Sequence, residues 1–314
     1  MTRYIIERIV AMLLTLFIIV TIAFCVVRLM PGSVYDNPEL PQKVLDALEA
    51  RDHLNEPIIV QYGYFLKGVI LEGDWGTSIK VEPSVPAFDV LVKRIPITLE
   101  VNVYSLLLSL PLGIVCGTLA ALKKNKLPDH IISAMVVLFI SVPSFVFASL
   151  MQYFLSFKLN LFPIVYESSA VGWARFSSMC LPILALAFGP IATVTRYLRG
   201  ELVETVNSEF MTLAKTKGLT QVQATVRHAF RNSCLPLANV IIPMFTNILG
   251  GSLVVEQIFA IPGVGGLMVK SINANDHPLT IAILIFYSLV SLLTILLVDL
   301  SYGIIDPRIR LEGK

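Results

Sequence analysis

The apolar residues of this chain gather in long runs that predict membrane-spanning helices. A helix needs about 20 predominantly apolar residues to cross the hydrocarbon core of a bilayer. Runs near this length cover residues 9–27, 97–122, 131–157, 177–195, 235–255 and 279–298. No small-residue cleavage site follows the first run, so we expect residues 1–30 to remain as an N-terminal anchor helix. The pattern predicts an all-α polytopic membrane protein with six transmembrane helices.

The distribution of lysine and arginine predicts the orientation of these spans. With the N-terminus inside, the inner segments hold fourteen basic residues, whereas the two short outer loops hold only Lys158, Arg175 and Lys270. Basic residues favour cytoplasmic loops. Since six spans return the chain to its starting side, we expect both termini to be cytoplasmic.

Composition agrees with a membrane protein and argues against several other classes. Apolar residues make up 55% of the chain and charged residues 15%, whereas soluble domains carry about 25% charge. A formal charge of +2 is too small to indicate a nucleic-acid surface. The four cysteines form no C-x-x-C pair, so we expect small packed hydrophobes and neither a metal site nor a disulfide framework.

Several spans contain helix breakers. Membrane helices tolerate such residues where neighbouring helices or a cavity satisfy the freed backbone groups, and small residues let helices approach closely. Kinked helices around a transport path and plain helix packing both explain the breakers, which are Pro111, Gly113, Gly117, Pro143, Pro190, Pro243, Gly250 and Gly251.

The predicted outer segment, residues 31–96, is too long to be an idle connector. Apolar residues recur at helical spacing in 41–54 and again in 57–70, where aromatic residues favour an interfacial helix. Residues 73–78 have the composition of a turn. This segment is either a structural cap over the helices or a docking platform for an outer partner.

The predicted cytoplasmic stretch 196–235 divides into two helices about Gly218. Lys217 followed by glycine is typical of a helix C-terminus with a left-handed cap. Thr220 with Gln223 three residues later predicts a capping box at the start of the next helix. Ala214 lies four residues before Gly218, so we expect both on one side of the hairpin. That side either admits another protein's backbone or packs on the chain's own helices.

The chain resembles a known family in this hairpin and beyond it. Residues 209–219, followed by 228–232 and 235–236, resemble the EAA loop of ABC importer permeases. Further motifs in order are similar to the first permease of the dipeptide/oligopeptide/nickel group, with the closest likeness to oligopeptide permeases at 141–145 and 158–163. The other motifs are Met30-Pro31-Gly32, Gln61-Tyr62, Gly73-Asp74-Trp75-Gly76, Arg94-Ile95-Pro96, Pro262-Gly263-Val264-Gly265 and Asp306-Pro307-Arg308.

The resemblance implies a type I permease core at 97–310 with five spans and a coupling hairpin at 196–235. It implies a heteromeric importer in the bacterial inner membrane, with a second homologous permease, two ABC ATPase subunits and an extracytoplasmic substrate-binding protein. ATP and Mg²⁺ would be held by the ATPases. The implied ATPase-coupling residues are Glu209, Phe210, Leu213, Ala214, Lys217 and Gly218, and the implied path or outer-gate residues are Asn247, Glu256, Phe259, Pro262, Gly263 and Gly265.

The implied cargo is an oligopeptide, with dipeptides, nickel or a metal chelate as alternatives. An ATP-independent channel or a scaffold is the rival class of function. The chain shows no H-E-x-x-H, G-x-S-x-G or phosphate-loop motif of an enzyme. We expect the acids near span ends, Glu100, Glu256 and Asp299, to pair with basic side chains. Polar residues such as Asn102, Gln152 and Asn239 are further candidates for lining the path.

Overall fold

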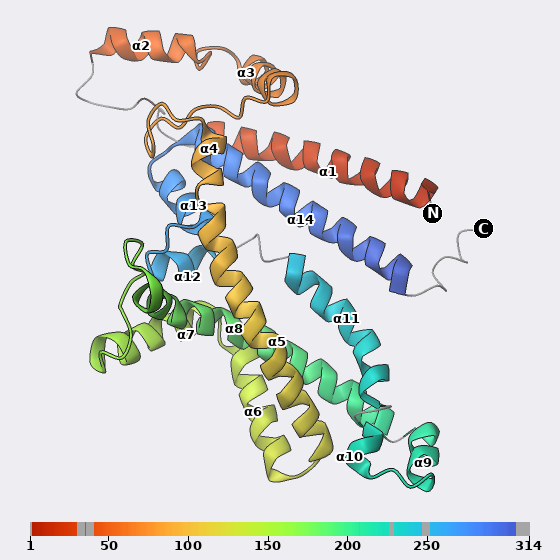
Figure 1. Ribbon diagram of the computed structural model, residues 1–314. Coiled ribbons are helices and arrows are strands. Elements are labelled where there is room, and N and C mark those ends of the chain that lie inside the picture. Colours follow the sequence, from red (N-terminus) through yellow and green to blue (C-terminus); the bar gives the residue numbers. More distant parts are fainter. Residues whose placement is uncertain are drawn as a thin grey trace. The chain divides into compact units, whose positions relative to one another are not determined.

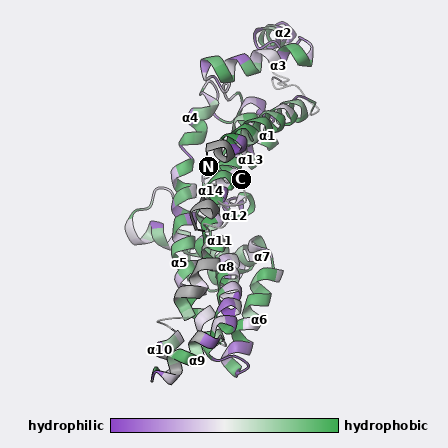
Figure 2. Cartoon of the chain, turned by 90° about the vertical axis from the view of Figure 1, so that its right-hand side faces the viewer, coloured by the Kyte–Doolittle hydropathy of each residue, from purple (hydrophilic) through white to green (hydrophobic). Residues whose placement is uncertain are grey.

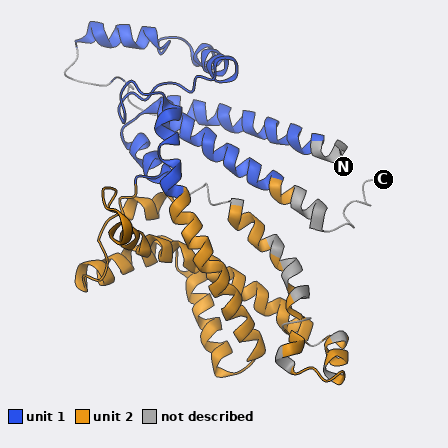
Figure 3. Ribbon diagram, in the orientation of Figure 1, with its two compact units in different colours: residues 1–98, 262–296 blue, residues 99–261, 297–314 orange. Residues whose placement is uncertain are grey.

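The computed structural model describes residues 2–29, 35, 41–206, 208–225, 229–246 and 252–305 (Figure 1). In these ranges the regular elements are helices, and the β-type pairing is an isolated bridge between Thr77 and Pro86. The chain divides into two compact units (Figure 3). Unit 1 comprises Met1–Thr98 and Pro262–Leu296, and unit 2 comprises Leu99–Ile261 and Leu297–Lys314.

Unit 1 is built on two long apolar helices and several short ones. The long helices are α1 (Thr2–Leu29) and α14 (His277–Ile305), the second of which ends in unit 2. The helical spacing in 41–54 and 57–70 corresponds to α2 (Gln42–Arg51) and α3 (Ile58–Lys67), the latter continued by the π-helix η1 (Gly68–Glu72). Two further short helices, not predicted, are α4 (Ala87–Val92) and α13 (Val264–Asn273).

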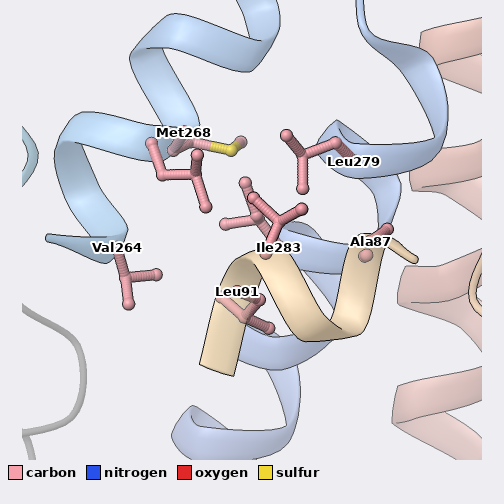
Figure 4. Packing of buried hydrophobic residues seen from close by; sticks show 9 residues of the cluster. Ala87, Leu91, Val264, Met268, Leu279 and Ile283 are labelled. Carbon is pink, nitrogen blue, oxygen red and sulfur yellow. The ribbon is translucent and has the colours of Figure 1, made fainter. Parts of the chain in front are cut away.

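A buried apolar cluster holds α4 and α13 of unit 1 to α14 (Figure 4). Ala87 and Leu91 of α4 meet Val264 and Met268 of α13, and Ile283 of α14 completes the contact. A second cluster packs Phe24 of α1 against α14, with aromatic residues of α3 beside it. The α3 and α4 parts of the outer segment are therefore fixed to the long helices by apolar burial.

Unit 2 contains most of α5 (Ile95–Leu122) and the longest helix, α8 (Gly172–Val206). Helices packed on α8 include α6, α7 and α11. The shorter elements are α6 (Leu127–Ser141), α7 (Ser144–Met151), η2 (Gln152–Lys158), α9 (Glu209–Thr216), α10 (Gln221–Ala224), α11 (Phe230–Thr246) and α12 (Leu253–Ile258).

Four stretches of the described residues are long and apolar enough to cross a membrane: Ile6–Leu29, Ala87–Leu122, Gly172–Val206 and His277–Asp299. The hydrophobic colouring of α1 is visible in Figure 2. The bent pair Leu127–Ser141 and Ser144–Lys158 forms a fifth span if it is counted as one. Part of the predicted span 235–255 lies outside the described residues, so the number six stays a prediction.

The helix is broken within two of the predicted spans, 131–157 and 235–255, both of which contain predicted helix breakers. The first bends by 100° between α6 and α7. Val142 is extended and Pro143 is the N-cap residue of α7, because proline disfavours helical backbone in the residue before it and has no N–H to donate. In the second, Ser252 is extended and caps the separate helix α12, so no helix continues through it.

The small residues of α5 are used for close helix packing. A Cβ built on Gly113 would lie 2.7 Å from Cβ of Val194, and one on Gly117 would lie 3.0 Å from the carbonyl oxygen of Thr195, both on α8. Thr195 Oγ1 donates a hydrogen bond of 3.2 Å to the Gly113 carbonyl oxygen. The Gly-x-x-x-Gly pair therefore lets the two backbones approach, as in other membrane helix pairs.

Candidate coupling and gate sites

The inward side of α9 is embedded in the core of unit 2. Met211 is fully buried and Ala214 is 8% exposed. Both belong to an apolar cluster with Leu198 and Leu202 of α8. Ala121 of α5, Ala224 of α10 and Leu237 of α11 belong to the same cluster. The short helix α9 is thus supported by residues from four other helices.

The C-terminus of α9 has the left-handed glycine cap that the sequence predicts. Gly218 has a φ of +92°, and a Cβ built on it would meet no atom within 4 Å. The Leu219 N–H donates to the Ala214 carbonyl oxygen at 3.3 Å, the six-to-one bond of a Schellman motif. The chain therefore turns sharply at Gly218, where a β-carbon would strain the backbone.

The predicted capping box is confirmed. The Thr220 N–H donates to Oε1 of Gln223 at 3.1 Å, and the Gln223 N–H donates to Oγ1 of Thr220 at 3.3 Å. These reciprocal bonds satisfy two of the N–H groups that a helix start leaves unpaired. Together with the glycine cap, they define the turn between α9 and α10.

The predicted coupling residues fall on two sides of α9. Leu213 is 57% exposed, and Glu209, Lys217 and Gly218 are also exposed. Ala214 instead faces the chain's own core, one of the two alternatives that its spacing left open. Phe210 lies within α9, and its side chain is outside the description.

Two of the predicted gate residues lie in unit 2 and are held firmly. Phe259 is fully buried and Glu256 is 2% exposed. The Phe259 carbonyl oxygen accepts a 2.8 Å hydrogen bond from the Tyr166 N–H. Gln152 Nε2 donates to the carbonyl oxygens of Ile164 and Ile258, at 2.8 and 2.9 Å. Gln152 therefore holds the loop beside Phe259. The sequence offered Gln152 as a candidate for lining the path, and this contact is structural.

The other gate residues lie in unit 1 or outside the description. Gly263 precedes α13, and both it and Gly265 are buried, while Pro262 is half-buried. The Val264 N–H donates to Oγ1 of Thr98 at 2.9 Å. Asn247 lies outside the described residues.

An ion pair joins the start of α8 to α5, as the sequence predicts for Glu100. Arg175 Nη1 donates to Oε1 of Glu100 at 2.9 Å, and Nη2 donates to the second carboxylate oxygen. Arg175 Nε donates to the hydroxyl oxygen of Tyr166 at 3.0 Å. The side chains of Arg175 and Glu100 are 34% and 26% exposed. This network continues through Tyr166 to the backbone of Phe259.

A second ion pair joins the far end of α8 to α6, and sequence reasoning missed it. Arg199 Nε and Nη2 donate to the two carboxylate oxygens of Asp129 at 2.6 and 2.8 Å. The Asn125 N–H donates to Oδ2 of Asp129 at 2.8 Å. Asp129 is only 1% exposed. It sits in the first turn of α6 beside Pro128, so its sequence context indicates only a helix N-terminus.

Unit 1 contains a cavity of about 780 Å³ beside α2 and α3. Tyr35, Arg51 and Asp52 form a hydrogen-bonded network in its wall. Burial and the hydrogen bond to Asp52 raise the pKa of Tyr35 to about 12. Burial opposes ionisation of Asp52, but the hydrogen bonds from Arg51 and Tyr35 outweigh it and lower the pKa of that carboxyl group. The network therefore keeps a neutral phenol beside a carboxylate at neutral pH.

A buried carboxylate fixes the turn at 73–81 in unit 1. Asp276 is fully buried, and its Oδ2 accepts hydrogen bonds from Oγ of Ser78 at 2.6 Å and from the N–H groups of Ile79, Lys80 and Val81 at 2.9–3.1 Å. Across the described ranges, no group of three or more His, Cys, Asp or Glu side chains is arranged to hold a metal ion.

Comparison with known proteins places these features in a family. Residues 111–311 match the family described as binding-protein-dependent transport system inner membrane component. The chain is 39% identical over 311 residues to a dipeptide transport system permease protein DppB of Lactococcus lactis, covering 99% of this chain and 100% of that protein. It is 33% identical over 313 residues to the oligopeptide transport system permease protein OppB of Haemophilus influenzae, with 99% and 100% covered.

Among solved structures, the chain is similar to one from inward-facing conformations of the MetNI methionine ABC transporter. The TM-score is 0.49 and the identity 16%, over 68% of this chain and 96% of that chain. The match of the family over more than half of the sequence, with full-length relatives above 30% identity, is decisive. This chain belongs to the binding-protein-dependent transport system inner membrane components, and it is a permease subunit of an ABC importer rather than an enzyme.

Proposed function

We propose that this chain forms half of the translocation path of a peptide importer in the bacterial inner membrane. A second homologous permease forms the other half, an extracytoplasmic binding protein delivers the peptide, and two ATPase subunits hold ATP and Mg²⁺. Full-length similarity to both dipeptide and oligopeptide permeases supports a peptide cargo. The higher identity to the dipeptide permeases favours short peptides as a second candidate beside oligopeptides.

The observation that carries this proposal is the two-sided environment of α9. Met211 and Ala214 are packed into the core of unit 2, whereas Leu213 and the charged Glu209 and Lys217 are exposed. A helix that is anchored on one side and exposed on the other can transmit a displacement from a partner to the spans. We therefore assign Glu209, Phe210, Leu213, Lys217 and Gly218 to the ATPase contact, and Ala214 to its support.

The mechanism is a shift between inward-facing and outward-facing arrangements. ATP binding closes the ATPase pair, and the partner can shift the permease only through its differential affinity for the two arrangements. The helix that receives this motion must be stiff, because a frayed helix would absorb the displacement. The glycine cap and the capping box provide this stiffness.

The proposal includes the membrane side of the termini and the position of the gate segment. Both termini and the α9–α10 hairpin lie on the cytoplasmic side, as the basic residues predict. The segment with Glu256, Phe259, Pro262, Gly263 and Gly265 lies at the outer mouth, where peptide leaves the binding protein. Asn247 belongs to the path by the same resemblance.

Uptake by the complete complex in proteoliposomes tests the function. We expect ATP-dependent accumulation of labelled di-, tri- or pentapeptides, with no accumulation of nickel. Accumulation without ATP indicates a channel and contradicts the proposal. Nickel accumulation without peptide accumulation contradicts the cargo.

A matched pair of glycine variants tests the coupling role of α9. Gly218 and Gly172 both have positive φ and open space around a built Cβ, so valine imposes a similar backbone strain at each, about 1–2 kcal/mol. We expect Gly218→Val to lower peptide uptake per ATP hydrolysed, whereas Gly172→Val leaves this ratio unchanged. An equal ratio in both variants contradicts the assignment of the Gly218 turn to the ATPase contact.

A further inference from the structure

We propose that the Asp129–Arg199 ion pair is a positioning pair that carries the displacement of α9 into α6 during transport. The inference rests on the proposed function, in which α9 receives motion from an ATPase. It assigns a role in coupling to two residues outside the resemblance motifs. All of the contacts that carry it lie within unit 2.

The first step connects α9 to α8. Leu198 and Leu202 of α8 are fully buried and share the apolar cluster of Met211 and Ala214. Leucines four residues apart lie on the same side of a helix. Because interiors are close-packed, a displacement of α9 pushes directly on this part of α8.

The second step connects α8 to α6. Arg199 follows Leu198 by one residue, so it points about 100° away from that leucine around the helix axis. Its guanidinium binds both carboxylate oxygens of Asp129, through Nε at 2.6 Å and Nη2 at 2.8 Å. A bidentate pair fixes the relative orientation of its two side chains as well as their distance.

The carboxylate of Asp129 is buried and joins three parts of unit 2. Asp129 is 1% exposed and also binds the Asn125 N–H in the turn between α5 and α6, while Ser133 Oγ lies 3.4 Å from Oδ1. One carboxylate thus joins α6, the α5–α6 turn and α8. Water has little access to replace these bonds, so the joint holds while the helices move.

The fourth step follows the displacement beyond α6. The helix α6 leads directly into the 100° bend and α7, and α7 packs against α12. Phe259, which we propose for the outer gate, follows α12 immediately. The pair therefore lies on a continuous packed route from the coupling helix to the gate segment of unit 2.

The test compares three carboxylate variants in the complete reconstituted complex. Asp129→Asn removes the charge at nearly constant shape, Asp129→Glu keeps the charge, and Glu82→Gln is the matched control. Glu82 forms a partly exposed pair with Arg94 in unit 1. We expect Asp129→Asn to lower peptide transported per ATP by about tenfold, within the range that single residues change coupling. Asp129→Glu should recover a substantial part of the loss, and Glu82→Gln should match the unsubstituted complex.

A distance measurement provides a readout that a merely structural role would not change. Spin labels are placed at Met135 on α6 and Glu204 on α8, both exposed, in a background without native cysteines. In the unsubstituted complex we expect the same distance without nucleotide and with trapped ATP, because the helices move together. In Asp129→Asn we expect a distance that changes or broadens when ATP is trapped.

The outcomes separate this inference from the proposed function. If the unsubstituted complex shows no ATP-driven peptide uptake, the proposed function fails, and the distance measurement still tests the joint. If uptake is normal but Asp129→Asn has an unchanged peptide-to-ATP ratio and an unchanged distance, the joint is overturned. A lower yield of intact complex with an unchanged ratio also overturns it, because the pair is then only structural.

Discussion

The two ends of α8 are tied to neighbouring helices by ion pairs of different character. Arg175 near one end binds Glu100 of α5, and Arg199 near the other binds Asp129 of α6. The two arginines are 24 residues apart, or about 36 Å at 1.5 Å per residue. This exceeds the hydrocarbon thickness of about 30 Å. Each arginine can therefore lie at a different membrane boundary while the apolar stretch between them crosses the core.

The pairs differ most in the burial of the carboxylate. The side chain of Glu100 is 26% exposed, whereas that of Asp129 is 2% exposed. Water can replace a partner of Glu100 when the helices rearrange, but it has little access to Asp129. The pair at the Arg199 end of α8 should therefore be the harder one to break.

The largest expected effect comes from breaking the buried pair. We expect Asp129→Ala to lower the free energy of unfolding by roughly 3 kcal/mol, because removing one partner of a buried pair leaves an uncompensated charge. Arg199 is 32% exposed, which places the effect at the lower end of the usual range. Denaturant unfolding of the purified protein in mild detergent measures it. A loss no larger than that in Glu100→Ala would contradict the difference between the two ends.

The next largest effect is expected at the close contact between α5 and α8, which lies between the two arginines of α8. We expect Gly113→Leu to lower the free energy of unfolding by about 1–3 kcal/mol, because the added side chain meets Val194 and overpacks the interface. Gly200→Leu on α8 is the matched control, since its built Cβ meets no atom within 4 Å. The same unfolding assay applies to both. Equal losses would show that the α5–α8 approach does not require glycine.

A smaller effect is expected at the hairpin that follows α8. Thr220→Ala removes the side chain that accepts from the Gln223 N–H, and loss of such a cap costs about 1 kcal/mol. Hydrogen exchange of α10 amides should become faster, while exchange in α5 stays unchanged. Thr220→Ser keeps the hydroxyl group and should restore the protection.

The smallest effect is expected at the exposed pair. Glu100→Gln should change the free energy of unfolding by about 0–1 kcal/mol, because partly exposed ion pairs contribute little. The difference from the unsubstituted protein should shrink further at high salt, since mobile ions screen such charges. A salt-independent loss larger than that of Asp129→Ala would reverse the comparison.

Much of the fold was predictable because membrane helices have a strong local signature. The apolar runs predict α1, α5, α8 and α14, and the stripes in the outer segment predict α2 and α3. The size of the bend at Val142 was not predictable, because a long apolar run conceals the 100° change of direction. Proline indicated a possible break there, but many membrane helices pass through proline because neighbours satisfy the freed groups. Whether the helix continues depends on those neighbours.

In the α9–α10 hairpin, too, some features were predictable from the sequence and others were not. The Gly218 turn and the Thr220 capping box were predictable because their bonds join residues a few positions apart. The side of α9 that faces the core was not, because Ala214 packs against residues of distant helices. Exposure of Leu213 likewise depends on where the rest of unit 2 lies.

The sequence by itself determined that this chain is a membrane permease, since hydropathy, caps and family motifs are local properties of consecutive residues. Only the tertiary structure decided that Asp129 and Arg199, 70 positions apart, share one buried joint, and that Gly113 and Gly117 pack against α8. The physical reason is the range of the interactions. Helix formation and capping act within a few residues, whereas ion pairs and close packing depend on which distant helices the fold brings together.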